Sequence, residues 1–191
     1  METKKIVLFA SGSGSNVENI FNYFQTKPGV EISCVLTNKR DAQVIDRCNR
    51  LKINALYFNR YSFYHTGFVC SVLKNLKPDL IVLAGFLWKI PQDLIDAFPQ
   101  KIVNIHPALL PKYGGKGMYG AHVHKAVKEN AETETGITIH YVNEHYDEGA
   151  IIQQAKTTLV EGDTPESIAA KVHELEYEHF PKVIEQLLKE G

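Results

Sequence analysis

The sequence predicts a doubly wound α/β fold with a mainly parallel β-sheet. Apolar runs of strand length alternate with stretches whose apolar residues are spaced as on one face of a helix. The apolar runs are continuous, which indicates strands buried on both faces, as in right-handed βαβ units. Later in the chain, two β-rich runs are joined by a polar connection too short for a crossover helix, which predicts an antiparallel pair.

Five strands and four helices are predicted in the first half of the chain. The strands are "KIVLFA" (5–10), "EISCVLTN" (31–38), "NALYFN" (54–59), "DLIVLAG" (79–85) and "KIVNIH" (101–106). The helices begin near Asn16, Asp41, Tyr61 and Pro91. Each of the first four strands is thus followed by a helix, as a parallel sheet requires.

The second half is predicted to contain a short helix, the antiparallel pair and a long C-terminal helix. The short helix covers about 121–130, and the paired strands are "GITIHYV" (136–142) and "AIIQQAKTTL" (150–159). Thr164 caps the final helix, and Pro165 occupies its first position, where a backbone N–H is not needed. No repeat or linker interrupts the sequence, so we expect residues 1–191 to form a single domain.

Composition favours a small-molecule substrate in the cytoplasm. Lys plus Arg number 21 against 22 for Asp plus Glu, so no overall charge attracts nucleic acid or a membrane surface. No stretch approaches the ~20 apolar residues of a membrane span. The apolar run at 6–10 is too short for a signal-peptide core. The three cysteines, Cys34, Cys48 and Cys70, lack metal or redox spacing and are typical of small buried side chains in a reducing compartment.

The first motif with chemical content is "SGSGSN", residues 11–16, between the first strand and the first helix. Glycines allow a ligand to approach the backbone, and the N-terminus of the following helix favours an anion. We interpret the loop as a phosphate cradle. It is not the dinucleotide fingerprint, because Val17 stands where the third glycine would be. A plain strand-to-helix turn is the alternative.

The second motif is Asn104 and His106 at the end of a predicted strand. Residues two apart on a strand share a face, and Pro107 and Pro111 stiffen the backbone that follows. An amide and an imidazolium can stabilise an oxygen that develops negative charge, and Asp147 from the loop "NEHYDEG" can sustain the imidazolium. This set suits attack on a carbonyl carbon. The alternative to a catalytic role is a capped strand end, in which the histidine makes its hydrogen bonds within the protein.

Metal and covalent catalysis receive no support from the sequence. His122 and His124 are two apart at a helix start, which is neither the i, i+4 pair nor the CxxC pair of zinc sites. No G-x-S-x-G elbow or reactive cysteine pattern is present. We expect no metal in this protein.

A resemblance to a known family spans nearly the whole chain. The segments "IVLFASGSGSN", "LAGF", "IVNIHPALLPKY" and "YDEGAIIQQ", in this order, resemble the folate-dependent formyltransferases. The resemblance implies a Rossmann-like formyltransferase fold that acts without a metal, as a monomer or homodimer. It implies transfer of a formyl group from 10-formyltetrahydrofolate to the amine of glycinamide ribonucleotide in de novo purine biosynthesis.

The resemblance also assigns roles to residues. It implies that Asn104, His106 and Asp147 are catalytic. The residues implied to bind substrate are Gly14, Ser15 and Asn16 for the phosphate, and Glu176 and His173 on the last helix; those implied to bind folate are Leu87, Trp88, Lys89, Ile90 and Asn143. The family often has Met-Arg-Ile next to "LAGF", so Leu87, Trp88 and Lys89 change the wall of the pterin pocket. The glycine-rich segment 114–120 is either a lid or a tightly turning connection.

Three other functions remain open at this point. Methionyl-transfer-RNA formyltransferase shares the catalytic trio, but we expect it to need an additional basic domain that does not follow here. A formyltetrahydrofolate deformylase would use the same residues with water as the acceptor. A nucleotide-binding module without catalysis would need only the glycine loop.

Overall fold

Within residues 3–190, which the computed structural model describes, the chain forms seven strands in one sheet. The strands are β1 (Lys4–Ala10), β2 (Val30–Thr37), β3 (Ala55–Tyr57), β4 (Leu80–Leu83), β5 (Ile102–His106), β6 (Glu134–Tyr141) and β7 (Ile151–Thr158). Their order is β3-β2-β1-β4-β5-β6-β7. The first five strands pair in parallel, and β6 pairs antiparallel with both β5 and β7. The predicted mainly parallel sheet and the antiparallel pair are confirmed.

Seven helices connect or follow these strands in the described part of the chain. They are α1 (Ser15–Phe24), α2 (Gln43–Leu51), α3 (Arg60–Tyr64), α4 (Phe68–Leu76), α5 (Gln92–Ala97), α6 (Ala121–Glu129) and α7 (Pro165–Glu190). None of these seven helices is both long enough and apolar enough to cross a membrane. The predicted starts lie within two residues of those observed.

One predicted helix is divided in two. The segment that begins near Tyr61 contains the short α3 and the separate α4. A capping box between Asn59 and Ser62 starts α3, and Gly67, in the left-handed conformation with φ of 65°, stands at the N-cap of α4. Because such caps require a break in helical geometry, the chain turns between the two helices.

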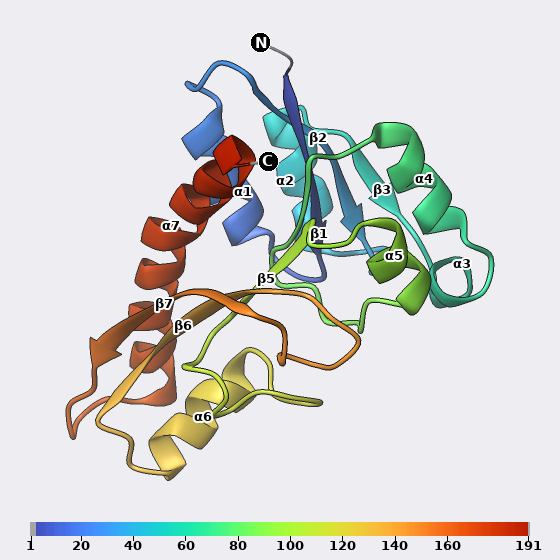
Figure 1. Ribbon diagram of the computed structural model, residues 1–191. Coiled ribbons are helices and arrows are strands. Elements are labelled where there is room, and N and C mark those ends of the chain that lie inside the picture. The colour runs from blue at the N-terminus through green and yellow to red at the C-terminus, as the bar shows by residue number, and fades with distance from the viewer. Residues whose placement is uncertain (1–2, 191) are drawn as a thin grey trace.

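Helices cover both faces of the sheet, as the doubly wound prediction requires. Figure 1 shows α3, α4 and α5 on one side of the sheet and α1, α2 and α7 on the other. Each side has its own apolar core. In β5, Val103 and Ile105 pack in the core on the α7 side, whereas Ile102 packs in the opposite core. Asn104 and His106 therefore share the face of Ile102, as the two-residue period of a strand predicts.

The order of the strands places a ligand site at one edge. The chain runs outward from β1 through β2 to β3, then returns to β4 on the other side of β1. At such a reversal the loops after neighbouring strands diverge and leave a crevice beyond their carboxyl ends. The loops that follow β1, β4 and β5 all reach this edge (Figure 1).

The turn after β1 depends on Gly14. This glycine is the N-cap of α1 and has a φ of 75°, in the left-handed region. A Cβ atom at this position would overlap the side chain of Val44 in α2, whereas a Cβ at Gly12 would meet no atom within 4 Å. The Val44 N–H also donates to the Gly12 carbonyl at 3.1 Å. Gly14 is therefore required by the packing of α1 against α2.

We expect Gly14→Ala to destabilise the fold by at least about 1–2 kcal/mol, because of the left-handed backbone and the contact with Val44. Gly12→Ala is the matched control, and it should leave the melting temperature nearly unchanged. Thermal denaturation followed by circular dichroism measures both. Equal melting temperatures for the two variants would show that the Val44 side chain moves aside and that the turn tolerates a side chain at residue 14.

Candidate active site

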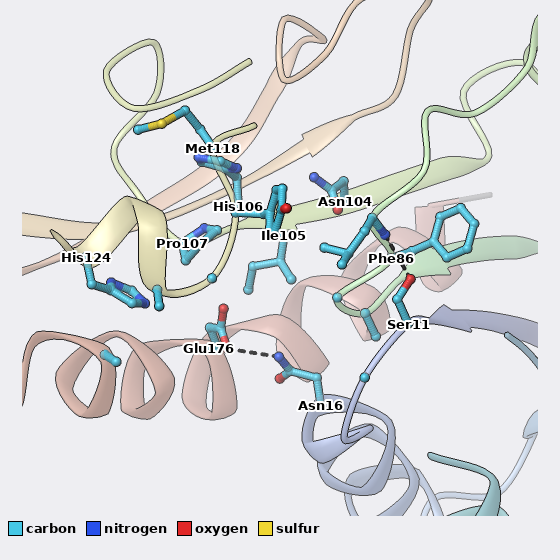
Figure 2. A pocket seen from close by; sticks show the side chains of 18 of the residues that line it. Ser11, Asn16, Phe86, Asn104, Ile105, His106, Pro107, Met118, His124 and Glu176 are labelled. Carbon is cyan, nitrogen blue, oxygen red and sulfur yellow. Dashed lines mark hydrogen bonds between the residues drawn. The ribbon is translucent and has the colours of Figure 1, made fainter. Parts of the chain in front are cut away.

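A pocket of about 760 Å³ opens at the edge where the loops after β1, β4 and β5 meet (Figure 2). It is lined by the segments 11–16, 84–87, 104–107 and 115–121, and by Lys39, His124, Tyr146, Asp147, Pro165, Glu166, Ala169, His173 and Glu176. The glycine loop and the polar end of β5, which the sequence places far apart, thus face one cavity.

The predicted trio lies together in this pocket. The Asp147 Oδ2 atom is 3.5 Å from Nδ1 of His106, and Asp147 Oδ1 is 3.7 Å from Nε2 of His140. The Asn104 amide nitrogen is 3.1 Å from the same His140 Nε2. Asn104, His106 and Asp147 therefore form one cluster, with His140 as a fourth member.

Sequence reasoning missed His140. In the antiparallel register, Asn104 stands opposite His140, and His106 stands opposite Thr138. The His140 ring is buried, and its Nδ1–H donates to the Tyr141 carbonyl at 2.8 Å. Nε2 is within hydrogen-bonding distance of the Asn104 amide nitrogen, and this contact fixes the orientation of the amide. The signal was the position of His140 within "GITIHYV", but it becomes informative only when the register is known.

Burial and charge set the protonation of His106 and Asp147. Burial lowers the pKa of His106, against the Asp147 carboxylate and the Tyr113 carbonyl, which raise it. Burial would raise the pKa of Asp147, but the neighbouring His140 and His106 and the Gly115 N–H together hold it below its usual value. Asp147 is therefore an anion that faces two buried imidazoles.

His106 has its other ring nitrogen occupied as well. Nε2–H donates to the Tyr113 carbonyl at 2.7 Å, while Nδ1 faces Asp147. Tyr113 has a φ of 57°, and its hydroxyl donates to Glu132 at 2.9 Å. Both nitrogens of the His106 ring thus have a neighbour that fixes the ring: the Tyr113 carbonyl, at the end of the segment stiffened by Pro107 and Pro111, and the Asp147 carboxylate.

The segment 114–120, which we call the glycine segment, crosses the pocket beside the cluster. Met118 and His106 both line the pocket, and Figure 2 draws Met118 on the segment that passes over this part of it. The Gly115 N–H donates to Asp147 Oδ2 at 2.9 Å. Gly115 and Gly117 have φ values of 93° and 92°, which other residues adopt only at a cost. The glycine segment therefore contributes both a wall of the pocket and one hydrogen bond to its carboxylate.

The second polar group in the pocket joins α1 to α7. The Asn16 amide donates to Glu176 Oε2 at 2.9 Å, and Nδ1 of His173 is 2.8 Å from the same oxygen (Figure 2). The Asn16 side chain is thus committed to Glu176, and its Oδ1 is buried without a hydrogen-bond partner among the described residues. Gly14 and Ser15 line the pocket at the start of α1, where backbone N–H groups are available. The residues predicted to bind the ribonucleotide therefore lie together. Gly14 and Ser15 offer backbone N–H groups, whereas Asn16, His173 and Glu176 present side chains.

The residues predicted for folate are not all at this pocket. Leu87 lines it, and the Leu87 N–H donates to the Ser11 hydroxyl at 3.0 Å. Trp88 packs with Phe58 and Phe86 in an aromatic cluster behind it. The other three do not line the pocket: Ile90 is buried in the core, the Lys89 carbonyl accepts from Tyr64, and Asn143 accepts from the His145 N–H within its own loop.

No group of three or more metal-ligating side chains with suitable geometry occurs within residues 3–190. Near the pocket, His106 and His140 donate to the Tyr113 and Tyr141 carbonyls, and His140 also contacts the Asn104 amide.

The pair of His173 and Glu176 gives a pH-dependent contribution to stability. The hydrogen bond to Glu176 raises the pKa of His173, although burial opposes it. A histidine with a raised pKa stabilises the folded state below its unfolded pKa of about 6.5, and this stabilisation is lost as the pH rises through the folded pKa. We expect His173→Gln, which keeps a hydrogen-bonding amide without the charge, to lower the melting temperature at about pH 5.5 and to have a smaller effect at about pH 9.

The control for that experiment is the Glu176→Gln background. There His173→Gln should no longer lower the melting temperature more at about pH 5.5 than at about pH 9, because no carboxylate remains to raise the histidine pKa against burial. A pH-independent effect in the native background would contradict the ion pair.

Comparisons with known proteins identify the family of this chain. The family model described as formyl transferase matches residues 4–184. Phosphoribosylglycinamide formyltransferase from Bacillus subtilis is 36% identical over 97% of this chain and 95% of the relative. The chloroplastic enzyme of the same name from Arabidopsis thaliana is 37% identical over 98% of this chain, which spans 66% of that relative's length. The chain likewise spans 62% of the chloroplastic relative from Vigna unguiculata.

A solved structure agrees with the fold over its full length. Glycinamide ribonucleotide transformylase 1 from Geobacillus kaustophilus superposes with a TM-score of 0.88 at 32% identity, covering 98% of this chain and 100% of that one. The family match covers most of the chain, and the relatives are similar over nearly all of it. The chain belongs to the formyl transferase family.

Proposed function

We propose that this protein transfers a formyl group from 10-formyltetrahydrofolate to the amine of glycinamide ribonucleotide, a step of de novo purine biosynthesis. One observation carries the proposal: a glycine loop at a helix N-terminus and the cluster of Asn104, His106 and Asp147 face the same pocket. A phosphorylated amine can be held at the first while a carbonyl carbon reacts at the second. The names of the relatives support the choice of substrates.

The phosphate is held at the start of α1. Backbone N–H groups in the first turn of a helix bind anions, and Gly14 and Ser15 bring them to the pocket. Arg47 supports the loop from α2, because its Nε–H donates to the Ser13 carbonyl at 2.6 Å. Lys39 adds a positive charge to the lining. The one acidic residue in the first turn, Glu18, is paired with Arg47 and Arg50, so its charge is compensated.

The amine reacts at the other end of the pocket. Its lone pair attacks the formyl carbon, a C–N bond forms, and the carbonyl oxygen gains negative charge. Asn104 has a second amide hydrogen beyond the one given to His140, and it donates this hydrogen to the oxygen. Collapse of the intermediate breaks the bond to the folate nitrogen, which leaves with the proton that the amine has lost.

His106 supplies the second donor, but this requires an exchange of partners. Its Nε2–H is engaged with the Tyr113 carbonyl. The formyl oxygen takes the place of that carbonyl as the negative charge develops, since a charged acceptor forms the stronger hydrogen bond. Asp147 faces the other ring nitrogen and favours a proton taken up there from solvent, which gives the imidazolium form. It also receives the amine proton through an intervening water and passes it to the folate nitrogen.

The remaining assignments are part of the same proposal. The chain acts as a single formyltransferase domain over residues 1–191, as a monomer or homodimer, in the cytoplasm. Free, buried Cys34, Cys48 and Cys70 are compatible with a reducing compartment. Leu87 contacts the folate within the pocket, and Trp88, Lys89, Ile90 and Asn143 contact a pterin that extends beyond it.

Substitution of the trio tests the mechanism. We expect His106→Ala, Asn104→Ala and Asp147→Asn each to lower kcat by at least about a hundredfold, as for lost oxyanion stabilisation. Asparagine suits position 147 because the backbone there has a φ of 57°, which asparagine tolerates. Turnover is measured with 10-formyltetrahydrofolate and glycinamide ribonucleotide, with formate release in the absence of the amine as a test for deformylase activity.

His145→Ala is the matched control for these variants, because His145 lies in the same loop as Asp147 and its side chain is 60% exposed. It should turn over at the normal rate. Near-normal turnover of His106→Ala would refute the mechanism. Rapid formate release that does not depend on the amine would show that the protein hydrolyses the formyl donor and is not a transferase.

The glycine segment is proposed to be a lid that excludes water from the formyl donor. Hydrogen exchange at residues 114–120 should slow when both substrates are bound, because the segment then packs over them. Exchange in β1 should remain unchanged and serves as the internal control. Exchange in the glycine segment that does not respond to a ternary complex would identify it as a fixed connection.

A further inference from the structure

His124 is a buried side chain of the pocket to which the mechanism above gives no role. It lies on α6, directly after the glycine segment, and is 4% exposed. It lines the same pocket as Asn104 and Glu176. Figure 2 shows its ring directed from α6 toward the space between Pro107 and the helix that carries Glu176.

The surroundings of His124 select one tautomer. Nδ1 is buried and has no hydrogen-bond partner in the described chain. A proton there would be an unsatisfied buried donor, which costs more than an unsatisfied lone pair. Burial also lowers the pKa of His124, with a further lowering from His173 and His106 and an opposing effect of Glu176. The ring is therefore neutral, with its only proton on Nε2.

The Nε2–H of His124 has no acceptor among residues 3–190. Glu176, whose charge acts on His124, already accepts from Asn16 and His173 through Oε2. Nε2 is not among the fully buried unpartnered atoms, as Nδ1 is, so it is the ring nitrogen that reaches the cavity. A neutral donor that faces an otherwise satisfied carboxylate suits a ligand oxygen placed between them.

We propose that His124 is a substrate-binding residue whose Nε2–H donates to an oxygen of the sugar-phosphate part of the amine substrate. This inference rests on the proposed function, because that substrate brings hydroxyl and phosphate oxygens to the side of the pocket formed by α6 and α7. The neutral Nε2–H can donate a hydrogen bond to either kind of oxygen without adding charge to the pocket. The folate, which reacts at the opposite side of the cluster, gains nothing from His124.

Three variants test the inference by calorimetric titration with glycinamide ribonucleotide in the absence of folate. His124→Leu removes the donor and should weaken binding about tenfold. His124→Gln places an amide N–H near the position of Nε2 and should restore the Kd to within about threefold of the native value. His122→Leu is the matched control on the same helix, outside the pocket lining, and should bind normally. The KM for 10-formyltetrahydrofolate should be the same in all variants.

The outcomes separate this inference from the proposed function. If the native protein binds the ribonucleotide and His124→Leu binds it equally well, His124 has no binding role and the proposed function stands. If the native protein does not bind the ribonucleotide, both are overturned. Nitrogen NMR of the native histidine rings provides a test without a variant: His124 should show an unprotonated Nδ1, and its Nε2 resonance should shift when the ribonucleotide is added. A proton on Nδ1, or no shift on binding, would overturn the inference.

Discussion

The carboxylate of Asp147 is the interaction on which the arrangement of the site depends. It faces His106 and His140 from one side and accepts the Gly115 N–H from the other. These neighbours come from β5, β6 and the glycine segment, so one buried anion relates three parts of the chain. Burial alone would favour the neutral acid, and these neighbours keep it charged. Without that charge, His106 would lose the carboxylate that raises its pKa, and the Gly115 N–H would have a weaker acceptor.

The fold and half of the site could be predicted from local sequence patterns. Continuous apolar strands gave the parallel sheet, and the two-residue period of β5 placed Asn104 beside His106. These features are local, because each depends on residues within a few positions of one another. The division between α3 and α4 was missed because capping at Asn59 and Gly67 outweighed the apolar pattern.

The rest of the site depends on contacts that no local pattern encodes. His140 reaches Asn104 only through the register of β5 and β6. Asn16 and Glu176 are 160 positions apart and meet because α1 and α7 pack on the same face of the sheet. Trp88 is only partly buried, because aromatic side chains of α3 and of the loops beside it pack against its ring. Whether a side chain is accessible to a ligand depends on the residues around it, which only the tertiary structure determines.

The hydrogen bond from Gly115 to Asp147 has a thermodynamic consequence. This N–H stabilises the carboxylate form, so its removal by any displacement of the glycine segment raises the affinity of Asp147 for a proton. Coupling of this kind is reciprocal: a proton on Asp147 weakens the attachment of the segment by the same free energy. The position of the glycine segment and the ionisation of Asp147 are therefore coupled. Low pH weakens the attachment of the segment, and attachment of the segment lowers the pKa of Asp147.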